Sequence, residues 1–201
     1  NGKGSVTAMV HAALVASGVR AARYTSPHLV HLRERFVVGD APVDDETLQQ
    51  VAGDVLDCAD RLQRDGVLPA SPTFFEATTA IAFEIFRRTR VEVALIEVGL
   101  GGRFDATNVL APPVGAITSI AFDHEQHLGH TLAEIASEKA GIIKPAMVVV
   151  CGALPPVALD VMKRAATERG ATLVEAIRDS RIHYEMEDGR ARMMVETEKH
   201  R

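Results

Sequence analysis

Near the middle of the chain, Val91 to Val98 form a run of strand length dominated by apolar residues, and the glycine-rich residues 99–108 follow at once. Such a run is typical of a parallel strand buried on both faces between helices. It is far shorter than the roughly 20 apolar residues that a membrane-spanning helix needs. The run therefore predicts a globular α/β protein.

Strand and helix patterns alternate through most of the chain. Helical spacing of apolar residues begins after the opening residues and recurs at 44–62, 74–88, 131–140 and 155–169, and short apolar runs typical of strands lie at 21–25, 115–120, 147–151 and 172–174. Residues 31–42 look extended or loop-like. The alternation predicts a three-layer α/β/α domain with a mainly parallel sheet. The C-terminal residues 182–196 alternate about Asp188-Gly189, which predicts a β-hairpin.

Composition narrows the class of protein further. The chain has 201 residues, of which 47% are hydrophobic and 24% charged, and its net charge of −5 argues against a nucleic-acid-binding protein. No secretory signal or membrane span is visible, so we expect a cytoplasmic protein that binds neither nucleic acid nor membrane and is a monomer. The two cysteines, Cys58 and Cys151, match no metal-ligand spacing, and we expect both to be buried, reduced thiols.

The first five residues, Asn1-Gly2-Lys3-Gly4-Ser5, have the composition of a phosphate-binding loop. Glycines let backbone N–H groups close around phosphate oxygens, and the helix that follows offers its positive end. Lys3 adds charge, and a hydroxyl such as that of Ser5 can reach magnesium. Because Gly4 separates the lysine from the serine, the pattern differs from the common Gly-Lys-Ser/Thr, and taken alone it fits an ordinary glycine-rich turn as well.

Polar residues stand at the carboxyl ends of three expected strands, where open α/β sheets bind ligands. They are Ser26, Glu97 and the pair Asp123-His124. A carboxylate inside an apolar strand is unfavourable unless it is paired or binds a cation, so Glu97 is a candidate metal ligand. The alternative is that Glu97 lies at a frayed strand end and faces water.

A further candidate is the segment Glu138-Lys139-Ala140-Gly141-Ile142-Ile143-Lys144-Pro145, which ends an expected helix. Lysines at a helix C-terminus often do no more than interact with the helix dipole. The residues alone do not decide between that role and a functional one.

Taken together, these segments are far more specific than any one of them. The order GKGS, TSPHL, FFEATT, EVGLGGRFDATN, DHEQHLG and EKAGIIKP resembles the folylpolyglutamate/dihydrofolate synthase family of the Mur ligase superfamily over nearly all of residues 1–150. Residues 151–201 match only in general pattern. The resemblance implies an ATP- and Mg²⁺-dependent ligase that phosphorylates a folate or dihydropteroate carboxylate and then joins it to L-glutamate.

The resemblance also implies roles for individual residues. Asn1, Gly2, Lys3, Gly4, Ser5 and Asn108 would bind ATP; Ser5, Ser26, Glu97, His124 and Lys139 would serve the magnesium site; and Ser26, Pro27, His28, Arg33, Arg35, Phe74, Phe75 and Glu76 would line the folate pocket. Lys3, Glu97, His124 and Lys139 would be the catalytic set. Lys139 falls where the family carries a lysine carbamylated by carbon dioxide, whose anion supports a second magnesium.

The same resemblance implies that residues 1–201 form the ATP-binding domain of a longer enzyme, without the start of the phosphate loop and the C-terminal domain. Two other functions stay open. One is a different phosphate-loop enzyme, such as a small-molecule kinase, and the other is a catalytically inactive nucleotide-binding module. The sequence does not separate dihydrofolate synthase, folylpolyglutamate synthase and bifunctional activity.

Overall fold

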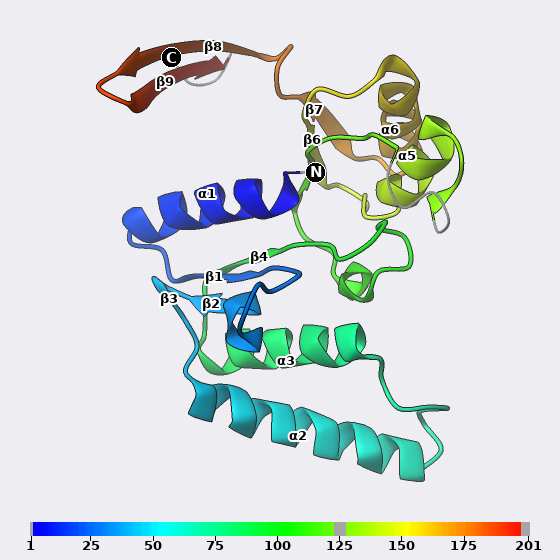
Figure 1. The fold of residues 1–201 in the computed structure, drawn as a ribbon. Helices are drawn as coiled ribbons and strands as arrows, with labels where there is room; N and C mark the ends of the chain where they lie inside the picture. The colour runs from blue at the N-terminus through cyan, green and yellow to red at the C-terminus, as the bar shows by residue number, and fades with distance from the viewer. Residues whose placement is uncertain (1, 123–127, 198–201) are drawn as a thin grey trace. The chain divides into compact units, whose positions relative to one another are not determined.

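The computed structural model describes residues 2–122 and 128–197, and within them the chain divides into two compact units (Figure 1). The N-terminal unit contains Gly2–Leu100 and Phe104–Val109. The C-terminal unit contains Gly101–Arg103 and the described residues from Leu110 onward.

A four-stranded sheet of order β3-β2-β1-β4 forms the middle of the N-terminal unit. Its strands are β1 (Ala21–Tyr24), β2 (Phe36–Val38), β3 (Ala41–Pro42) and β4 (Val93–Ile96). β1 and β4 run parallel, with Tyr24 opposite Ile96, whereas β2 and β3 are antiparallel additions. The parallel pair therefore brings the residues that follow β1 next to those that follow β4.

Three helices accompany this sheet: α1 (Lys3–Ala16), α2 (Asp45–Arg64) and α3 (Phe74–Arg88). The sheet lies between α1 and α3, and α2 packs on the far side of α3 (Figure 1). Asp44 caps α2 by accepting from the Thr47 amide, as its sequence position predicts. Buried side chains of the sheet, α2 and α3 form one hydrophobic core, whose largest fully buried members include Tyr24, Phe36 and Ile85.

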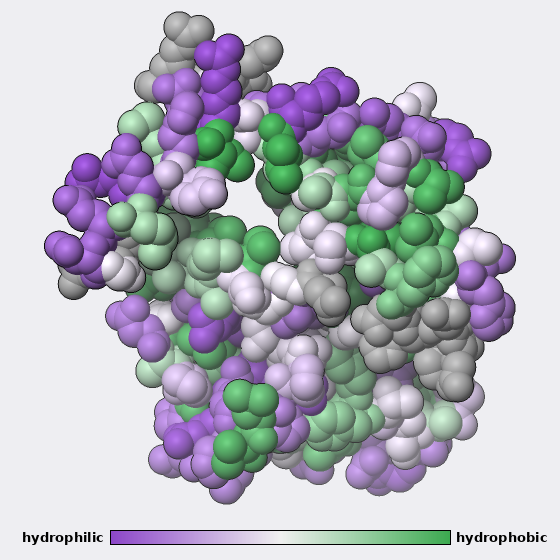
Figure 2. Space-filling view, turned by 45° about the horizontal axis from the view of Figure 1, so that its top comes forward, coloured by the Kyte–Doolittle hydropathy of each residue, from purple (hydrophilic) through white to green (hydrophobic). Residues whose placement is uncertain are grey.

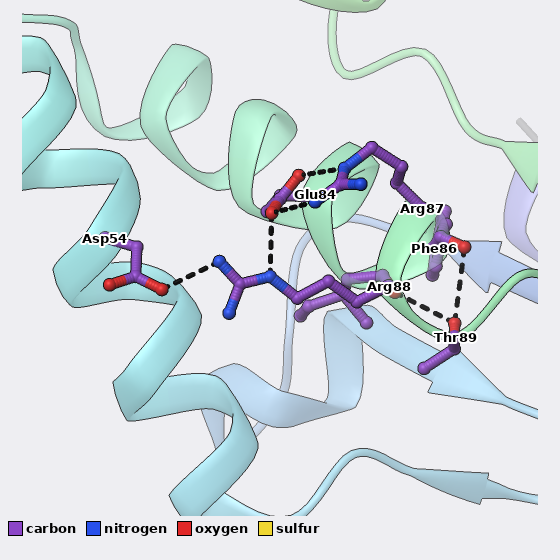
Figure 3. A network of polar contacts seen from close by, with 7 residues as sticks. Asp54, Glu84, Phe86, Arg87, Arg88 and Thr89 are labelled. Carbon is purple, nitrogen blue, oxygen red and sulfur yellow. Dashed lines mark hydrogen bonds and ion pairs between the residues drawn. The ribbon is translucent and has the colours of Figure 1, made fainter.

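Charged residues join α2 to the end of α3 (Figure 3). The Arg88 guanidinium donates to Glu84 on its own helix and to Asp54 on α2, each at 2.7 Å, and Arg87 also donates to Glu84. The paired arginines lower the pKa of Glu84 to about 2. The Thr89 hydroxyl then donates to the Ile85 carbonyl at 2.8 Å and ends the helix.

The C-terminal unit is built on a parallel sheet of order β5-β6-β7. The strands are β5 (Val114–Ile117), β6 (Val148–Cys151) and β7 (Thr172–Glu175), and the helices are α5 (Leu132–Ala140) and α6 (Pro156–Glu168). α5 and α6 pack against each other, and their apolar faces share a core with the sheet.

Two short 3₁₀ helices, η1 (Leu32–Arg35) and η2 (Ala106–Val109), belong to the N-terminal unit.

The last two strands, β8 (Ser180–Glu187) and β9 (Arg190–Thr197), pair antiparallel in a sheet of their own. Asp188 and Gly189 join them with φ of 49° and 72°, the positive values that a two-residue hairpin turn of this kind requires. The hairpin expected from the alternating residues is thus confirmed.

The α/β class, the parallel strand pairs and the terminal hairpin are confirmed, while two details differ. The parallel pairs lie in two hydrogen-bonded sheets, and residues 36–42, expected to be extended or loop-like, supply β2 and β3. The expectation of two buried cysteines is wrong for Cys58, because this residue lies outside the buried stripe of α2 and is exposed, whereas Cys151 is buried in β6.

The surface drawn in Figure 2 mixes hydrophobic and hydrophilic residues rather than showing one uniform apolar face. Among the described residues, every helix is too short or too polar to cross a membrane.

Candidate functional site

The start of α1 is where the phosphate loop was expected. Gly2 precedes the helix with φ of 82°, a left-handed conformation that glycine adopts without the steric cost of a Cβ, and its carbonyl accepts from the Val6 amide at 3.0 Å. Lys3, Gly4 and Ser5 form the first helical turn, and the N-cap residue Gly2 has no side chain to cap it. The first amide groups of a helix have no partner within the helix, so this end can receive an anion. Asn1 lies outside the described residues.

Glu97 lies beside this helix end. Its carboxylate accepts from the Ser26 amide at 3.2 Å, and Oε2 is 3.5 Å from the position that a Cβ on Gly4 would occupy. The parallel pairing of β1 and β4 explains the geometry, because Ser26 and Glu97 both follow the ends of paired strands. Glu97 is only 7% exposed. The expectation of a frayed strand end in water does not fit this burial.

The chemistry of these groups fits a magnesium ion. Glu97 offers carboxylate oxygen, and Ser5 and Ser26 offer hydroxyl oxygen, which are the hard ligands that Mg²⁺ prefers. Within residues 2–122 and 128–197, no three His, Cys, Asp or Glu side chains cluster as a metal site. His124, the remaining expected ligand near this site, lies outside the described residues.

Three of the expected folate-pocket residues are in contact with one another. The Arg35 guanidinium lies over the Phe74 ring, 5.2 Å from its centroid, and Arg35 Nε donates to Nδ1 of His28 at 2.9 Å. Arg35 is buried, whereas Phe74 at the start of α3 is 59% exposed. A buried cation, an exposed aromatic ring and an imidazole thus form one group of side chains.

The loop that carries His28 is held by a residue that the sequence patterns did not single out. The Glu34 carboxylate accepts from the backbone amides of Leu29, Val30 and His31 at 2.7–3.0 Å. These hydrogen bonds, led by those from His31 and Leu29, lower the pKa of Glu34 to about 2. A Glu three residues after a possible N-cap is the one sequence signal that could have identified it.

The other expected folate-pocket residues have structural contacts. Phe75 packs 6.1 Å from Tyr24, and its ring fills the space where Gly99 lacks a Cβ. Glu76 caps α3 by accepting from the Thr73 amide and hydroxyl, each at 2.7 Å, and these bonds lower its pKa.

Two more members of that set lie on the neighbouring loop and in η1. Pro27 follows Ser26 through a cis peptide bond and is exposed. Arg33 makes a long ion pair with Asp45, 3.9 Å between Nη1 and Oδ2.

Within the glycine-rich segment, Asp105 organises the backbone and was missed from the sequence. Its carboxylate accepts from the amides of Leu100 and Thr107, at 2.9 and 3.0 Å, and from the Thr107 hydroxyl at 2.5 Å. Asn108, the residue expected to contact ATP, lies half-buried in η2, and its backbone N–H donates to the Asp105 carbonyl at 2.9 Å.

Lys139 lies half-buried in the last turn of α5, in the C-terminal unit. The Glu138 carbonyl in the same turn accepts from the Arg103 amide at 2.9 Å. Gly141 is pressed against Arg103, since a Cβ there would lie 2.4 Å from the Arg103 Cα. Residues 101–103 of the glycine-rich segment are therefore packed against the lysine-bearing helix end, although Arg103 and Lys139 are 36 residues apart in the sequence.

A second arginine holds the same helix end. Arg169, at the end of α6, donates from Nη1 to the carbonyls of Ala140 and Ile143 at 2.5 and 2.8 Å. Because the last carbonyls of a helix have no helical partner, a cation here is favourable. No sequence motif marks Arg169, since the contact depends on how α6 packs against α5.

Comparison with known proteins finds relatives that share the name folylpolyglutamate synthase. A folylpolyglutamate synthase from Lacticaseibacillus casei is 38% identical over 202 residues, covering 94% of this chain and 47% of the relative. A dihydrofolate synthase/folylpolyglutamate synthase from Bacillus subtilis is 38% identical over 188 residues, covering 93% and 43%. A solved FPGS–AMPPCP–folate complex superposes with a TM-score of 0.93 at 36% identity, covering 100% of this chain and 49% of that chain. No family profile matches the chain.

The chain spans about half the length of the curated relatives that it matches. The identity extends along nearly all of its sequence, and the fold is shared along its whole length. The chain belongs to the folylpolyglutamate synthase/dihydrofolate synthase family.

Proposed function

We propose that the protein uses ATP to join L-glutamate to a folate-type carboxylic acid. The observation that carries this proposal is the open N-terminus of α1 beside the buried Glu97 carboxylate, which together suit a nucleotide phosphate and its counter-ion. The proposal is supported by relatives named folylpolyglutamate synthase and dihydrofolate synthase/folylpolyglutamate synthase, and by a related structure that is a complex with AMPPCP and folate.

The first step is phosphoryl transfer from ATP to the substrate carboxylate. A carboxylate oxygen attacks the γ-phosphorus, the bond to the β-phosphate oxygen breaks, and ADP leaves. Backbone amides of Gly2 to Ser5, the Lys3 ammonium and Asn108 hold the nucleotide in this proposal, with Asn1 at the edge of the same loop. Such a reaction depends mainly on positioning and on neutralising phosphate charge.

The second step forms the amide bond. The glutamate amine attacks the acyl carbon of the acyl phosphate, inorganic phosphate leaves, and the amine loses a proton. Magnesium would supply charge neutralisation at the phosphates, with Glu97, Ser26, Ser5 and His124 as its protein ligands. The catalytic residues in this proposal are Lys3, Glu97, His124 and Lys139.

Lys139 is proposed to react with carbon dioxide. Its neutral amine would add to the carbon, a proton would leave, and the resulting carbamate would be an anion able to support a second magnesium. The hydrogen bonds from Arg103 and Arg169 to the end of α5 support this role because they fix the helix turn that carries Lys139.

On the folate side we propose that one group of residues lines the folate pocket: Ser26, Pro27, His28, Arg33, Arg35, Phe74, Phe75 and Glu76. Either dihydropteroate or a folate already bearing glutamate would be the acid. Residues 1–201 would act as the ATP-binding domain of a longer enzyme, a cytoplasmic monomer with small-molecule substrates only.

The test is Glu97→Ala in the full-length protein, with Glu92→Ala as the matched control. Glu92 is another glutamate of the same apolar run, but it is exposed and pairs with Arg20 at the surface. Loss of a magnesium ligand removes transition-state stabilisation on the order of several kcal/mol, so Glu97→Ala should nearly abolish turnover without unfolding the protein. Wild-type turnover of Glu97→Ala at limiting Mg²⁺ would contradict the assignment.

A further inference from the structure

Arg35 is a buried cation that has no anionic partner among the described residues. It is 7% exposed, and its interactions are the hydrogen bond to His28 and the stacking over Phe74. None of the carboxylates in the described part of the chain pairs with it. By contrast, Arg20 and Arg88 each face a glutamate at 3.3 Å or less, although both are more exposed.

Removing a guanidinium from water without an anion is unfavourable, because the charge loses hydration and gains no counter-charge. The only fully buried side-chain nitrogen or oxygen without a partner, among the described residues, is Nε2 of His11. The terminal nitrogens of Arg35 therefore keep some contact with solvent. They remain available to an incoming ligand, and their planar fork matches the two oxygens of a carboxylate.

The surroundings of Arg35 indicate what kind of molecule carries that carboxylate. Phe74 is 59% exposed, and Leu29 and Val30 are 91% and 74% exposed on the loop that Glu34 holds in place. Apolar side chains held outward on an ordered loop suit a flat, largely apolar ligand body. The combination favours an aromatic acid over a bare inorganic anion.

We propose that Arg35 binds a carboxylate of the folate-type substrate that does not take part in the reaction, namely one on a glutamyl residue already attached. This rests on the proposed function. A carboxylate that attacks ATP needs its oxygen free, so a tight bidentate pair with Arg35 would hinder that attack. Dihydropteroate has a single carboxylate, the reacting one, and would gain nothing from Arg35. Arg35 thus favours glutamylated folates over dihydropteroate.

The experiment uses Arg35→Gln and Arg35→Lys in the full-length protein, with Arg87→Gln as the control. Arg87 lies on α3 as Phe74 does, but it is exposed and pairs with Glu84. Binding of folic acid and of pteroic acid, which lacks the glutamyl residue, is measured by titration without ATP. Turnover is then measured with tetrahydrofolate and with dihydropteroate, varying glutamate and ATP in turn.

Arg35→Gln should weaken folic acid binding and raise the KM for tetrahydrofolate by about tenfold or more, as expected for a charged hydrogen-bonded pair. Affinity for pteroic acid and the KM for dihydropteroate, glutamate and ATP should stay within about twofold. Arg35→Lys should show an intermediate loss, because it keeps the charge and loses the fork. If Arg35→Gln does not fold, as judged by circular dichroism, Arg35→Lys carries the test.

Unchanged folic acid binding in a folded Arg35→Gln variant would overturn the proposal. An equal loss of affinity for folic and pteroic acid would also overturn it, because Arg35 would then bind the rings that both acids share. A rise confined to the KM for glutamate would overturn it too, because Arg35 would then bind the free amino acid. Failure of the proposed function would look different, because the wild-type protein would then neither bind folic acid nor release ADP in a glutamate-dependent way.

Discussion

Gly141→Ala tests the packing that holds the lysine-bearing end of α5. Gly141 has φ of −56° and ψ of −21°, a helical conformation that alanine adopts readily. Helix propensity alone would make the alanine variant more stable, by up to about 1 kcal/mol. The structure predicts that the alanine variant is less stable instead, because the added Cβ would lie 2.4 Å from the Cα of Arg103 and 2.8 Å from its backbone nitrogen.

The magnitude follows from the size of that overlap. Carbon atoms in ordinary contact are about 3.5–4.0 Å apart, so the Arg103 backbone would have to retreat by about 1 Å. Arg103 is not free to do so without weakening its hydrogen bond to Glu138. Overpacked positions usually lose about 1–3 kcal/mol, which exceeds the propensity gain. We therefore expect Gly141→Ala to lower the free energy of unfolding and the Tm by several degrees.

Gly53→Ala is the matched control. Gly53 is also a helical glycine, in α2, but nothing lies within 4 Å of the Cβ that alanine would add. This variant should be stabilised by about 0.5–1 kcal/mol. Chemical unfolding of the two variants beside the wild type gives the comparison. Equal stabilisation in both variants would refute the close approach of the glycine-rich segment to α5.

Three further predictions concern other parts of the fold. Because the pKa of Glu34 is lowered from 4.5 to about 2, its stabilising hydrogen bonds are complete above pH 4.5 and are lost as the pH falls toward 2. Carboxyl NMR should show this titration, and Glu34→Gln should flatten the pH dependence of stability between those two pH values. Tyr24→Phe removes a buried hydrogen bond of 2.9 Å to Thr78 and should lower stability by about 1 kcal/mol in urea unfolding, whereas no change would mean that the hydroxyl is not bonded. In the full-length protein Lys139→Ala should impair turnover severely with partial rescue by short carboxylates, and Lys144→Ala should impair it less; equal loss without rescue would count against the carbamate.

Local sequence signals predicted most helices and strands because the elements are set by short-range patterns. Residues 74–88 were predicted as a helix and form α3 with the same bounds, and Thr131 caps α5 as its position suggests. Residues 31–42 were expected to be extended or loop-like, and β2 and β3 were not assigned within them because each has three residues or fewer, too short for alternation to be visible. Their pairing with β1 exists only in the folded sheet.

Local sequence signals also predicted part of the candidate site. Ser26 follows one apolar run and Glu97 lies near the end of another, so the rule for strand ends placed them together. The contact of Arg169 with the end of α5 depends on tertiary packing, and so does the burial of Arg35, beside which no described carboxylate is paired. Neither residue type nor spacing marks such contacts, since an arginine in a sequence is by default a solvated surface residue.

A single assay of the full-length protein decides whether it carries out ATP-dependent ligation of glutamate. ATP, Mg²⁺, L-glutamate and either tetrahydrofolate or dihydropteroate are supplied, and ADP release is measured together with the mass of the folate product. We predict that ADP appears only when both glutamate and the folate-type acid are present, in step with a product that is one glutamyl residue heavier. ADP release that needs no glutamate and leaves a phosphorylated product would identify a kinase. Nucleotide binding without any ADP release would identify an inactive module, and either result would contradict the account.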